Sequence, residues 1–410
     1  MITTGKKPMS WLTYIAILSV CFIINLPGVA VAPIEGKLKV LLDTSELEIQ
    51  LLTTLPNFVI IPFVFLSGSL SGYRHKIPLI IASLLLFMGC GFIYIFTPTM
   101  AGMIWASCLL GAADGILIPF AMGFVVNAFT GKYRTRNLGI KSATSNLGTV
   151  VASFVVGWLL TGNNWHLPFV VYLVAVVPLI FCYWLKEIPG FGAEENLSES
   201  EFSKECVMQD KNKGIDYKKI WGLICNNACF TFITFAFVIY LPQLLQSYNW
   251  SPKMSAAIIA VFFIAVLASG FVLEHFIKFL KSLVYPVLGL LLTGGLALMV
   301  FIKAPWAMYT GSVLAGLAFG IFQPLIYDKT SYAVKDPKKN IFGLSLVLCA
   351  LYIAIALEPF IISGITALFH VPDENHFAFV LSFFLAAAYI VFSFIFRHRF
   401  PFSISPSYYS

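Results

Sequence analysis

Apolar residues fall into twelve long runs separated by short polar segments. Each run approaches or exceeds the roughly 20 residues that a helix needs to cross a bilayer. Lipid cannot satisfy free backbone groups, so each run is expected to be a helix. The predicted spans are 10–34, 49–71, 77–97, 101–128, 140–161, 167–185, 219–243, 253–274, 282–302, 305–327, 341–368 and 376–396. An even number of spans places both termini on the same side of the membrane.

The distribution of lysine and arginine predicts which side that is. With both termini in the cytoplasm, only four of the 26 lysines and arginines lie on the outer side: Lys37, Lys39, Lys253 and Lys303. Cytoplasmic loops of multi-pass proteins carry this excess of positive residues. The net charge of +7 therefore reflects topology, and no nucleic-acid partner is expected.

Composition excludes several other classes of protein. Of the 410 residues, 59% are hydrophobic and 11% are charged, whereas soluble domains contain about 25% charged residues. A soluble enzyme and a disordered chain are excluded as the main body. The cysteines form no CxxC pair and the histidines no HxxxH pair, so we expect no metal site and no cofactor. The chain contains no P-loop, which argues against transport driven by ATP.

The longest polar stretch divides the chain into two parts. Residues 187–218 are rich in Glu, Lys, Asn and Ser. We interpret them as a cytoplasmic linker between an N-terminal six-helix half, 1–186, and a C-terminal six-helix half, 219–410.

An internal repeat relates the two halves. The fourth and tenth spans share Ser, Gly, Gly and Pro at identical spacing, offset by 205 residues: Ser107, Gly111, Gly115 and Pro119 recur as Ser312, Gly316, Gly320 and Pro324. Two weaker echoes relate 136–140 to 339–344 and 68–72 to 270–274. The pattern indicates two parallel six-helix repeats, an architecture of secondary transporters whose site lies between the repeats.

Several local motifs resemble those of the major facilitator superfamily. Residues 68–76 resemble the family's loop between helices two and three, with Gly72 in place of the usual Asp and Glu274 as the corresponding acid of the second half. Residues 133–139 resemble the basic loop between helices four and five, and 157–169 the junction of helices five and six. The resemblance implies an all-α polytopic membrane protein with the major facilitator fold, twelve transmembrane helices and two six-helix pseudo-repeats. It also implies latch loops that hold one conformation, here Gly68, Gly72, Arg74, Lys76, Arg134, Arg136 and Glu274.

Spans one and two are most similar to the twelve-helix drug:proton antiporter and sugar-efflux branch. The similarity rests on Pro27, Pro33 and the segment 51–56. The chain departs from that branch at Ser107, where an arginine is frequent, and it lacks the usual Gly-Pro pair of helix five. The resemblance implies a monomer in a bacterial cytoplasmic membrane, with a small-molecule substrate, protons and membrane lipid as partners.

Two acidic residues lie well inside predicted spans, away from their ends, and are candidates for proton coupling. Asp114 lies near the middle of span four, and Glu358 lies in span eleven before Pro359. A charge inside a bilayer costs at least about 2.5–3.5 kcal/mol and marks a functional residue. Desolvation favours the protonated carboxyl, so either residue could exchange a proton, and Asp114 could also bind a cationic substrate. Each has a structural alternative: Asp114 as a hydrogen-bond acceptor, for example from Ser107, and Glu358 as a partner of backbone groups freed by Pro359.

Uncharged polar residues are the other candidates for substrate binding. By resemblance, helices one, four, seven and ten line the central cavity, which selects Asn25, Asn226, Asn227, Tyr240 and Gln323 together with Asp114. Hydrogen bonding between helices is the alternative role. No lysine or arginine is predicted deep in a span, and Asp328 is expected to pair with Lys329 at the cytoplasmic end of span ten. We therefore expect a neutral, amphipathic or cationic substrate.

The sequence thus predicts a proton-coupled secondary transporter, and not an enzyme. The expected mechanism is alternating access, and the expected activity is antiport that exports small amphipathic or cationic organic molecules. One alternative is an importer or uniporter of a small neutral or amphipathic metabolite. Another is a scaffold or sensor that transports nothing.

Overall fold

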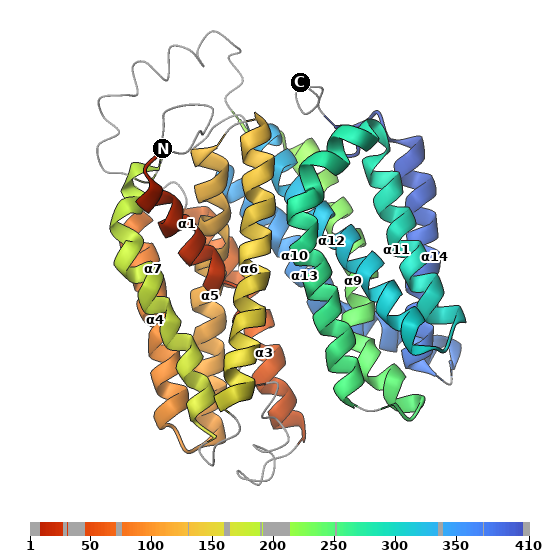
Figure 1. The fold of residues 1–410 in the computed structure, drawn as a ribbon, viewed down its shortest axis with the longest axis horizontal. Coiled ribbons are helices and arrows are strands. Elements are labelled where there is room, and N and C mark those ends of the chain that lie inside the picture. Colours follow the sequence, from red (N-terminus) through yellow and green to blue (C-terminus); the bar gives the residue numbers. More distant parts are fainter. Residues whose placement is uncertain are drawn as a thin grey trace. The chain divides into compact units, whose positions relative to one another are not determined.

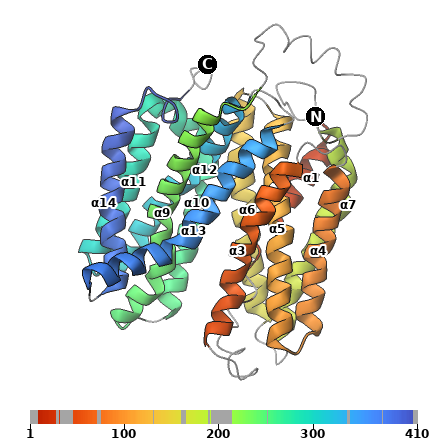
Figure 2. The same cartoon turned by 180° about the vertical axis from the view of Figure 1, so that it is seen from behind.

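The computed structural model describes residues 9–27, 31, 46–70, 76–129, 131–159, 165–188, 191, 214–250, 252–334, 339–371 and 373–404. These residues are predominantly helical (Figures 1 and 2). Within them no extended strand forms, and one isolated β-bridge joins Ile215 to Val334. The prediction of an all-α protein is therefore confirmed.

Helical segments occupy every predicted span. The first group comprises α1 (Trp11–Ile23), α3 (Glu46–Ser69), α4 (Lys76–Phe96), α5 (Met100–Ala128), α6 (Gly131–Leu159), the 3-10 helix η3 (Leu167–Ala175), α7 (Val176–Phe181) and the 3-10 helix η4 (Cys182–Glu187). The second comprises α9 (Tyr217–Ser247), α10 (Pro252–Leu280), the 3-10 helix η5 (Lys281–Leu283), α11 (Val284–Phe301), α12 (Pro305–Ala333), α13 (Asn340–Phe369) and α14 (Glu374–Ile395). The run η3–α7–η4 corresponds to the single predicted span 167–185.

Eight helical stretches of the described chain are long and apolar enough to cross a membrane. One of them, 257–301, joins α10 and α11 and so covers two predicted spans. Helix α6 is 29 residues long and is not among the eight. These helices make the chain an integral, multi-pass membrane protein.

Span one is shorter as a helix than the sequence predicts. Helix α1 begins where the Ser10 hydroxyl accepts a 3.1 Å hydrogen bond from the Thr13 amide, the geometry of a helix N-cap. It ends at Ile23, and a turn follows. Pro27 has no amide hydrogen and disfavours a helical conformation at Leu26, which explains the early end within the predicted 10–34.

The chain divides into two compact units. The first unit contains 1–134, 147–217 and 330–349, and the second contains 135–146, 218–329 and 350–410. The first unit thus includes the beginning of α13, whose remainder lies in the second unit, and the second unit includes residues 135–146 of α6, whose two ends lie in the first. The predicted division into halves 1–186 and 219–410 stays a prediction, and most of the linker 187–218 lies outside the described residues.

Both of these helix segments make close contacts with glycine residues of the unit to which they belong. In the second unit, a Cβ on Gly270 of α10 would lie 2.6 Å from the carbonyl oxygen of Gly139 of α6. In the first unit, a Cβ on Gly68 of α3 would lie 2.6 Å from the side chain of Ser345 of α13. Small residues let membrane helices approach this closely. The sequence echo of 68–72 with 270–274 therefore marks two equivalent helix crossings.

A serine-to-carbonyl hydrogen bond repeats in both units. The Ser107 hydroxyl of α5 donates a 3.1 Å bond to the Leu52 carbonyl of α3. The Ser312 hydroxyl of α12 donates a 2.7 Å bond to the Ile258 carbonyl of α10. The donors are 205 residues apart and the acceptors 206. The strongest sequence repeat is thus also a repeat of contacts.

One turn further along, glycines bring the same helix pairs into backbone contact. A Cβ on Gly111 would lie 2.6 Å from the carbonyl oxygen of Pro56, and a Cβ on Gly316 would lie 2.5 Å from that of Phe262. Only glycine permits such an approach, since it lacks a Cβ. The helix pairs α3–α5 and α10–α12 therefore pack through the same kind of contact, in which a glycine lies against a backbone carbonyl.

Candidate functional site

A buried polar cluster lies in the second unit, where α12 packs against α9. The Gln323 amide nitrogen of α12 donates to the Asn227 side-chain oxygen of α9 at 3.2 Å and to the Thr231 hydroxyl at 3.5 Å. Asn227 and Thr231 are four residues apart, so they share one face of α9. Gln323 is 6% exposed, and its side-chain oxygen accepts no hydrogen bond from any described residue. A buried acceptor is thus available for a ligand donor.

Aromatic rings flank this cluster. Phe322 of α12 stacks on Phe230 of α9 with ring centroids 3.9 Å apart and an interplanar angle of 11°. One turn earlier on α12, Phe319 makes an edge contact with Phe235 at 5.5 Å. Apolar and aromatic surface with a few placed polar groups is typical of small-molecule sites. The cluster can therefore hold a molecule that combines a ring or chain with a hydrogen-bond donor.

The other predicted binding residues lie elsewhere. Asn226 turns toward α14, where its side-chain oxygen accepts a 2.9 Å bond from the Tyr389 hydroxyl. Tyr240 is buried nine residues beyond Thr231 on α9. Asn25 belongs to the first unit, lies past the end of α1 and is exposed. The structure thus brings together Gln323 and Asn227 of the predicted set, and it adds Thr231, whose i, i+4 spacing from Asn227 was the available signal.

Asp114 is buried in the first unit, with 2% of its surface exposed. It lies seven residues after Ser107 on α5, which places both on the same face of the helix. Ser107 donates to Leu52 of α3 and shares a hydrogen bond with the Tyr94 hydroxyl of α4. Asp114 therefore lies on the side of α5 that faces α3 and α4. The Ser107 hydrogen is directed to Leu52 and is not available to Asp114.

Glu358 is fully buried on α13 in the second unit. Neither of its carboxyl oxygens has a hydrogen-bond partner in the described part of the chain, so the expected backbone partner freed by Pro359 is not observed. An ionised carboxylate without a partner is strongly disfavoured in an apolar environment. This environment favours the neutral, protonated carboxyl.

Asp328 and Lys329 lie deeper than the sequence predicts. Helix α12 continues to Ala333, and both side chains are buried. The Thr135 hydroxyl donates a 3.3 Å bond to Asp328. The Lys329 ammonium lies 4.2 Å from the centre of the Tyr285 ring and donates to the Pro401 carbonyl. Lys329 lies outside the predicted span 305–327, so the prediction that no lysine or arginine lies deep in a span does not concern it; it is buried because α12 extends beyond the apolar run.

This lysine is not an open site for an anion. Asp328 next to it attracts its charge, and the Tyr285 ring and the Pro401 carbonyl occupy its donors. A cation so engaged has little capacity left for a ligand. The preference for neutral or cationic substrates is therefore compatible with a buried lysine.

The predicted latch residues of the first unit make aromatic and helix contacts. The Lys76 ammonium lies 5.2 Å from the centre of the Phe191 ring, and the Arg134 guanidinium lies 4.6 Å from that of Tyr332. Gly68 lies at the crossing of α3 and α13, as described above. Two further predicted residues, Gly72 and Arg74, lie outside the described residues.

In the second unit, two predicted latch residues, Arg136 and Glu274, form a charged group with Lys278. A carboxylate oxygen of Glu274, near the end of α10, lies 2.8 Å from the Lys278 ammonium. Arg136, near the beginning of α6, adds a further electrostatic attraction to Glu274. Opposite charges thus connect α6 and α10 where Gly139 and Gly270 meet. Breaking this group is a step that a change of packing between these helices would require.

Comparison with known proteins identifies the family. A family model described as Major Facilitator Superfamily matches residues 13–357. The Multidrug transporter protein MdtP of Bacillus subtilis (strain 168) is 27% identical over 117 residues, which cover 28% of this chain and 22% of that protein. The chain thus matches about a fifth of the length of this curated relative.

Solved structures of three transporter chains have a similar fold. The proton:xylose symporter XylE bound to 6-bromo-6-deoxy-D-glucose has a TM-score of 0.69 at 13% identity and covers 94% of this chain and 95% of its own. A double tryptophan mutant of XylE has a TM-score of 0.74 at 12% identity, with coverages of 95% and 96%. The human organic anion transporter MFSD10 has a TM-score of 0.64 at 13% identity, with coverages of 92% and 97%. At this identity the likeness concerns the fold alone. The chain belongs to the major facilitator superfamily, a family of membrane transporters rather than enzymes.

Proposed function

We propose that the protein is a proton-coupled secondary transporter that exports small amphipathic or cationic organic molecules by alternating access. The observation that carries this proposal is the buried Glu358 carboxyl, whose two oxygens have no hydrogen-bond partner among the described residues. In a transporter, such a group would couple protonation to conformation.

The coupling follows from the cost of burying charge. Glu358 must hold a proton while it is enclosed, since the ionised form would lose its hydration without a compensating partner. A conformation that admits water to Glu358 would let the proton leave. Proton binding would thus favour one conformation and proton release the other, which is the differential interaction that a conformational switch requires. Asp114 of α5 is proposed as a second proton-binding residue.

The Gln323 cluster supports a substrate with a hydrogen-bond donor. The free side-chain oxygen of Gln323 would accept a bond from the N–H of an amine, and the Phe230–Phe322 stack would contact an apolar group or attract a cation. We include Asn227 in this site by geometry. Asn25, Tyr240 and Asp114 remain proposed contacts by family resemblance, whereas Asn226, which accepts from Tyr389 of α14, is not proposed as part of this cluster. The partial match to MdtP, named as a multidrug transporter, supports export.

A second candidate function is import or uniport of a small neutral metabolite. The amide and hydroxyl groups of Gln323, Asn227 and Thr231 carry no formal charge, which also suits hydroxyl groups of a substrate. The fold neighbour XylE is named as a proton:xylose symporter. Uniport would show flux that does not depend on a proton gradient.

The proposal also covers the orientation of the chain in the membrane, its oligomeric state and the residues that stabilise one conformation. The excess of lysine and arginine supports an orientation with both termini in the cytoplasm, and the family resemblance is our reason to propose a bacterial cytoplasmic membrane. We propose that the monomer is the transporting unit and that 1–186 and 219–410 are its two halves. The charges of Arg136 and Glu274 would stabilise one of the alternating conformations, together with the other predicted latch residues.

Energised dye efflux tests this proposal. Cells that express the wild type, the Asp114→Asn variant at equal level or an empty vector are loaded with ethidium, a lipophilic cation. The proposal expects that the wild type lowers accumulation, that a protonophore abolishes this effect and that the variant is inactive. Accumulation equal to that of the empty vector would refute export of cations. A metabolite library screened in proteoliposomes would then test the second candidate.

A further inference from the structure

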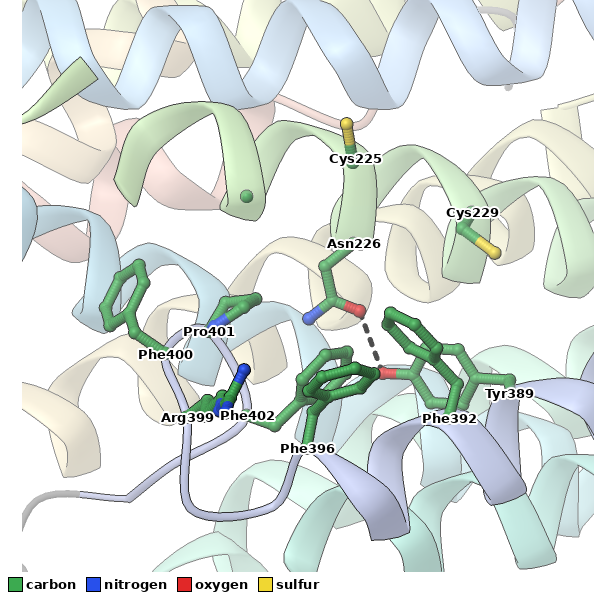
Figure 3. A pocket seen from close by; sticks show the side chains of 11 residues that line it. Cys225, Asn226, Cys229, Tyr389, Phe392, Phe396, Arg399, Phe400, Pro401 and Phe402 are labelled. Carbon is green, nitrogen blue, oxygen red and sulfur yellow. Dashed lines mark hydrogen bonds between the residues drawn. The ribbon is translucent and has the colours of Figure 1, made fainter. Parts of the chain in front are cut away.

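A pocket of ≈ 460 Å³ opens on the second unit between α9, α14 and the segment that follows α14 (Figure 3). Aromatic side chains form most of its wall, including Phe392, Phe396 and Phe402. Its polar side chains include Asn226 of α9, Tyr389 of α14 and Arg399. It is separate from the Gln323 cluster, because neither Gln323 nor Asn227 lines it.

The polar groups of this pocket offer donors. Asn226 is 5% exposed, and its side-chain nitrogen donates to no described residue. Its side-chain oxygen is engaged, since it accepts from the Tyr389 hydroxyl at 2.9 Å. Figure 3 shows the Asn226 nitrogen on the side of Arg399 and Pro401, away from Tyr389. A buried donor left without an acceptor costs free energy, so a ligand that supplies the acceptor is favoured here.

Positive charge gathers at one end of the pocket. Arg399 is exposed, and its guanidinium lies 5.8 Å from the centre of the Phe396 ring. Lys219, at the beginning of α9, lies 5.8 Å from the centre of the Phe400 ring, which also lines the pocket. None of the described lining residues is acidic. The charge of the pocket is therefore complementary to an anion.

The other end of the pocket lies along membrane-spanning helices. Cys225 and Cys229 line it from α9 and are exposed on the surface of that helix. Both α9 and α14 are apolar enough to cross a membrane, so exposed surface on them faces lipid chains. A matching ligand has an anionic head with acceptor oxygens and an apolar tail.

We propose that this pocket binds an anionic phospholipid from the leaflet in which α9 begins and α14 ends. Arg399 holds the phosphate of the lipid, and a glycerol ester oxygen of the lipid accepts a hydrogen bond from Asn226. An acyl chain lies along Phe392 and Cys229. Basic pockets at the ends of membrane helices bind anionic head groups in this way. The inference concerns lipid recognition and does not depend on which substrate is transported.

Native mass spectrometry of the purified, delipidated full-length protein tests the proposal. The protein is titrated with phosphatidylglycerol and, separately, with phosphatidylcholine. Arg399→Gln is compared with Arg397→Gln, a matched control whose guanidinium lies 4.3 Å from the centre of the Phe394 ring and does not line the pocket. We expect preferential binding of phosphatidylglycerol, weakened about five-fold or more in Arg399→Gln and unchanged in Arg397→Gln. Equal binding of both lipids, or equal losses in both variants, would overturn the proposal.

Thiol alkylation locates the bound lipid. Phosphatidylglycerol should slow the alkylation of Cys229 several-fold and leave Cys108, on α5 of the first unit, unaffected. The protection should disappear in Arg399→Gln, and thermal unfolding confirms that this variant is folded. Oleate and inorganic phosphate serve as further probes. If either protects Cys229 as well as phosphatidylglycerol does, or if the lipid protects both cysteines equally, a phospholipid site is refuted.

Discussion

Replacing Gly316 by alanine tests whether the repeated glycine contacts hold the helix pairs together. A Cβ at this position would lie 2.5 Å from the Phe262 carbonyl oxygen, which is 0.9 Å short of the 3.4 Å at which ordinary contacts begin. The obstacle is backbone and cannot rotate away. Helices α10 and α12 must therefore separate to admit the methyl group.

The magnitude follows from a matched comparison. Overpacking of this kind costs about 1–3 kcal/mol, whereas alanine is favoured over glycine within a helix by about 0.8–1 kcal/mol. At Gly294 of α11 an added Cβ would meet no atom within 4 Å. Gly294→Ala therefore gains the helix preference without the clash. The difference between the two variants isolates the clash at about 1–3 kcal/mol.

Thermal unfolding of the purified protein in detergent, followed by tryptophan fluorescence, measures this difference. At about 2–4 °C per kcal/mol for units of this size, Gly316→Ala should melt roughly 2–12 °C below Gly294→Ala. Gly111→Ala, its counterpart in the first unit, should fall in the same range because its Cβ meets the Pro56 carbonyl at 2.6 Å. Equal melting temperatures for Gly316→Ala and Gly294→Ala would refute the reasoning.

Three further substitutions test the site and its support. Gln323→Leu removes the free acceptor and should lower ethidium efflux at least about ten-fold, and normal efflux would exclude this group from the substrate site. Asp328→Asn leaves the buried Lys329 without its counter-charge, which costs about 3–5 kcal/mol. The yield of folded protein should therefore drop in this variant and recover when Lys329→Met is added. A stable Asp328→Asn variant would contradict this expectation. Tyr389→Phe leaves the Asn226 oxygen without its donor and should lower the stability to thermal unfolding by about 1–3 kcal/mol, whereas an unchanged melting temperature would show that this hydrogen bond contributes nothing.

The sequence predicts the fold through features that are local or repeated. Long apolar runs predict the helices because the bilayer allows few alternatives. Ser312 and Gly316 have the same spacing as Ser107 and Gly111 of span four. This spacing predicts the structural repeat because these residues themselves make the contacts with the neighbouring helix. Span one could not be bounded in the same way, since Pro27 ends the helix within a continuous apolar run.

The candidate site was predictable only in part. Gln323 and Asn227 are polar residues in apolar helices and stand out in any sequence, and the structure places them in contact. Their neighbour Asn226 looks equivalent in sequence, yet it lies about 100° around the helix and bonds to α14 instead. The burial of Lys329 was missed because hydropathy ends the span before the helix ends. The contacts between side chains depend on how helices distant in the sequence pack together. A single sequence does not reveal that packing.

Proton movement driven by substrate tests the central claim most directly. Proteoliposomes that contain the wild type, Glu358→Gln or the control Asp373→Asn enclose a pH-sensitive dye, and an ethidium gradient is imposed. Asp373 caps α14, a role that asparagine also fills, so this control should behave as the wild type. The account predicts that ethidium drives proton counterflow through the wild type and the control, and that Glu358→Gln, although folded, moves no protons. Counterflow through Glu358→Gln at the wild-type rate, or none through the wild type, would contradict it.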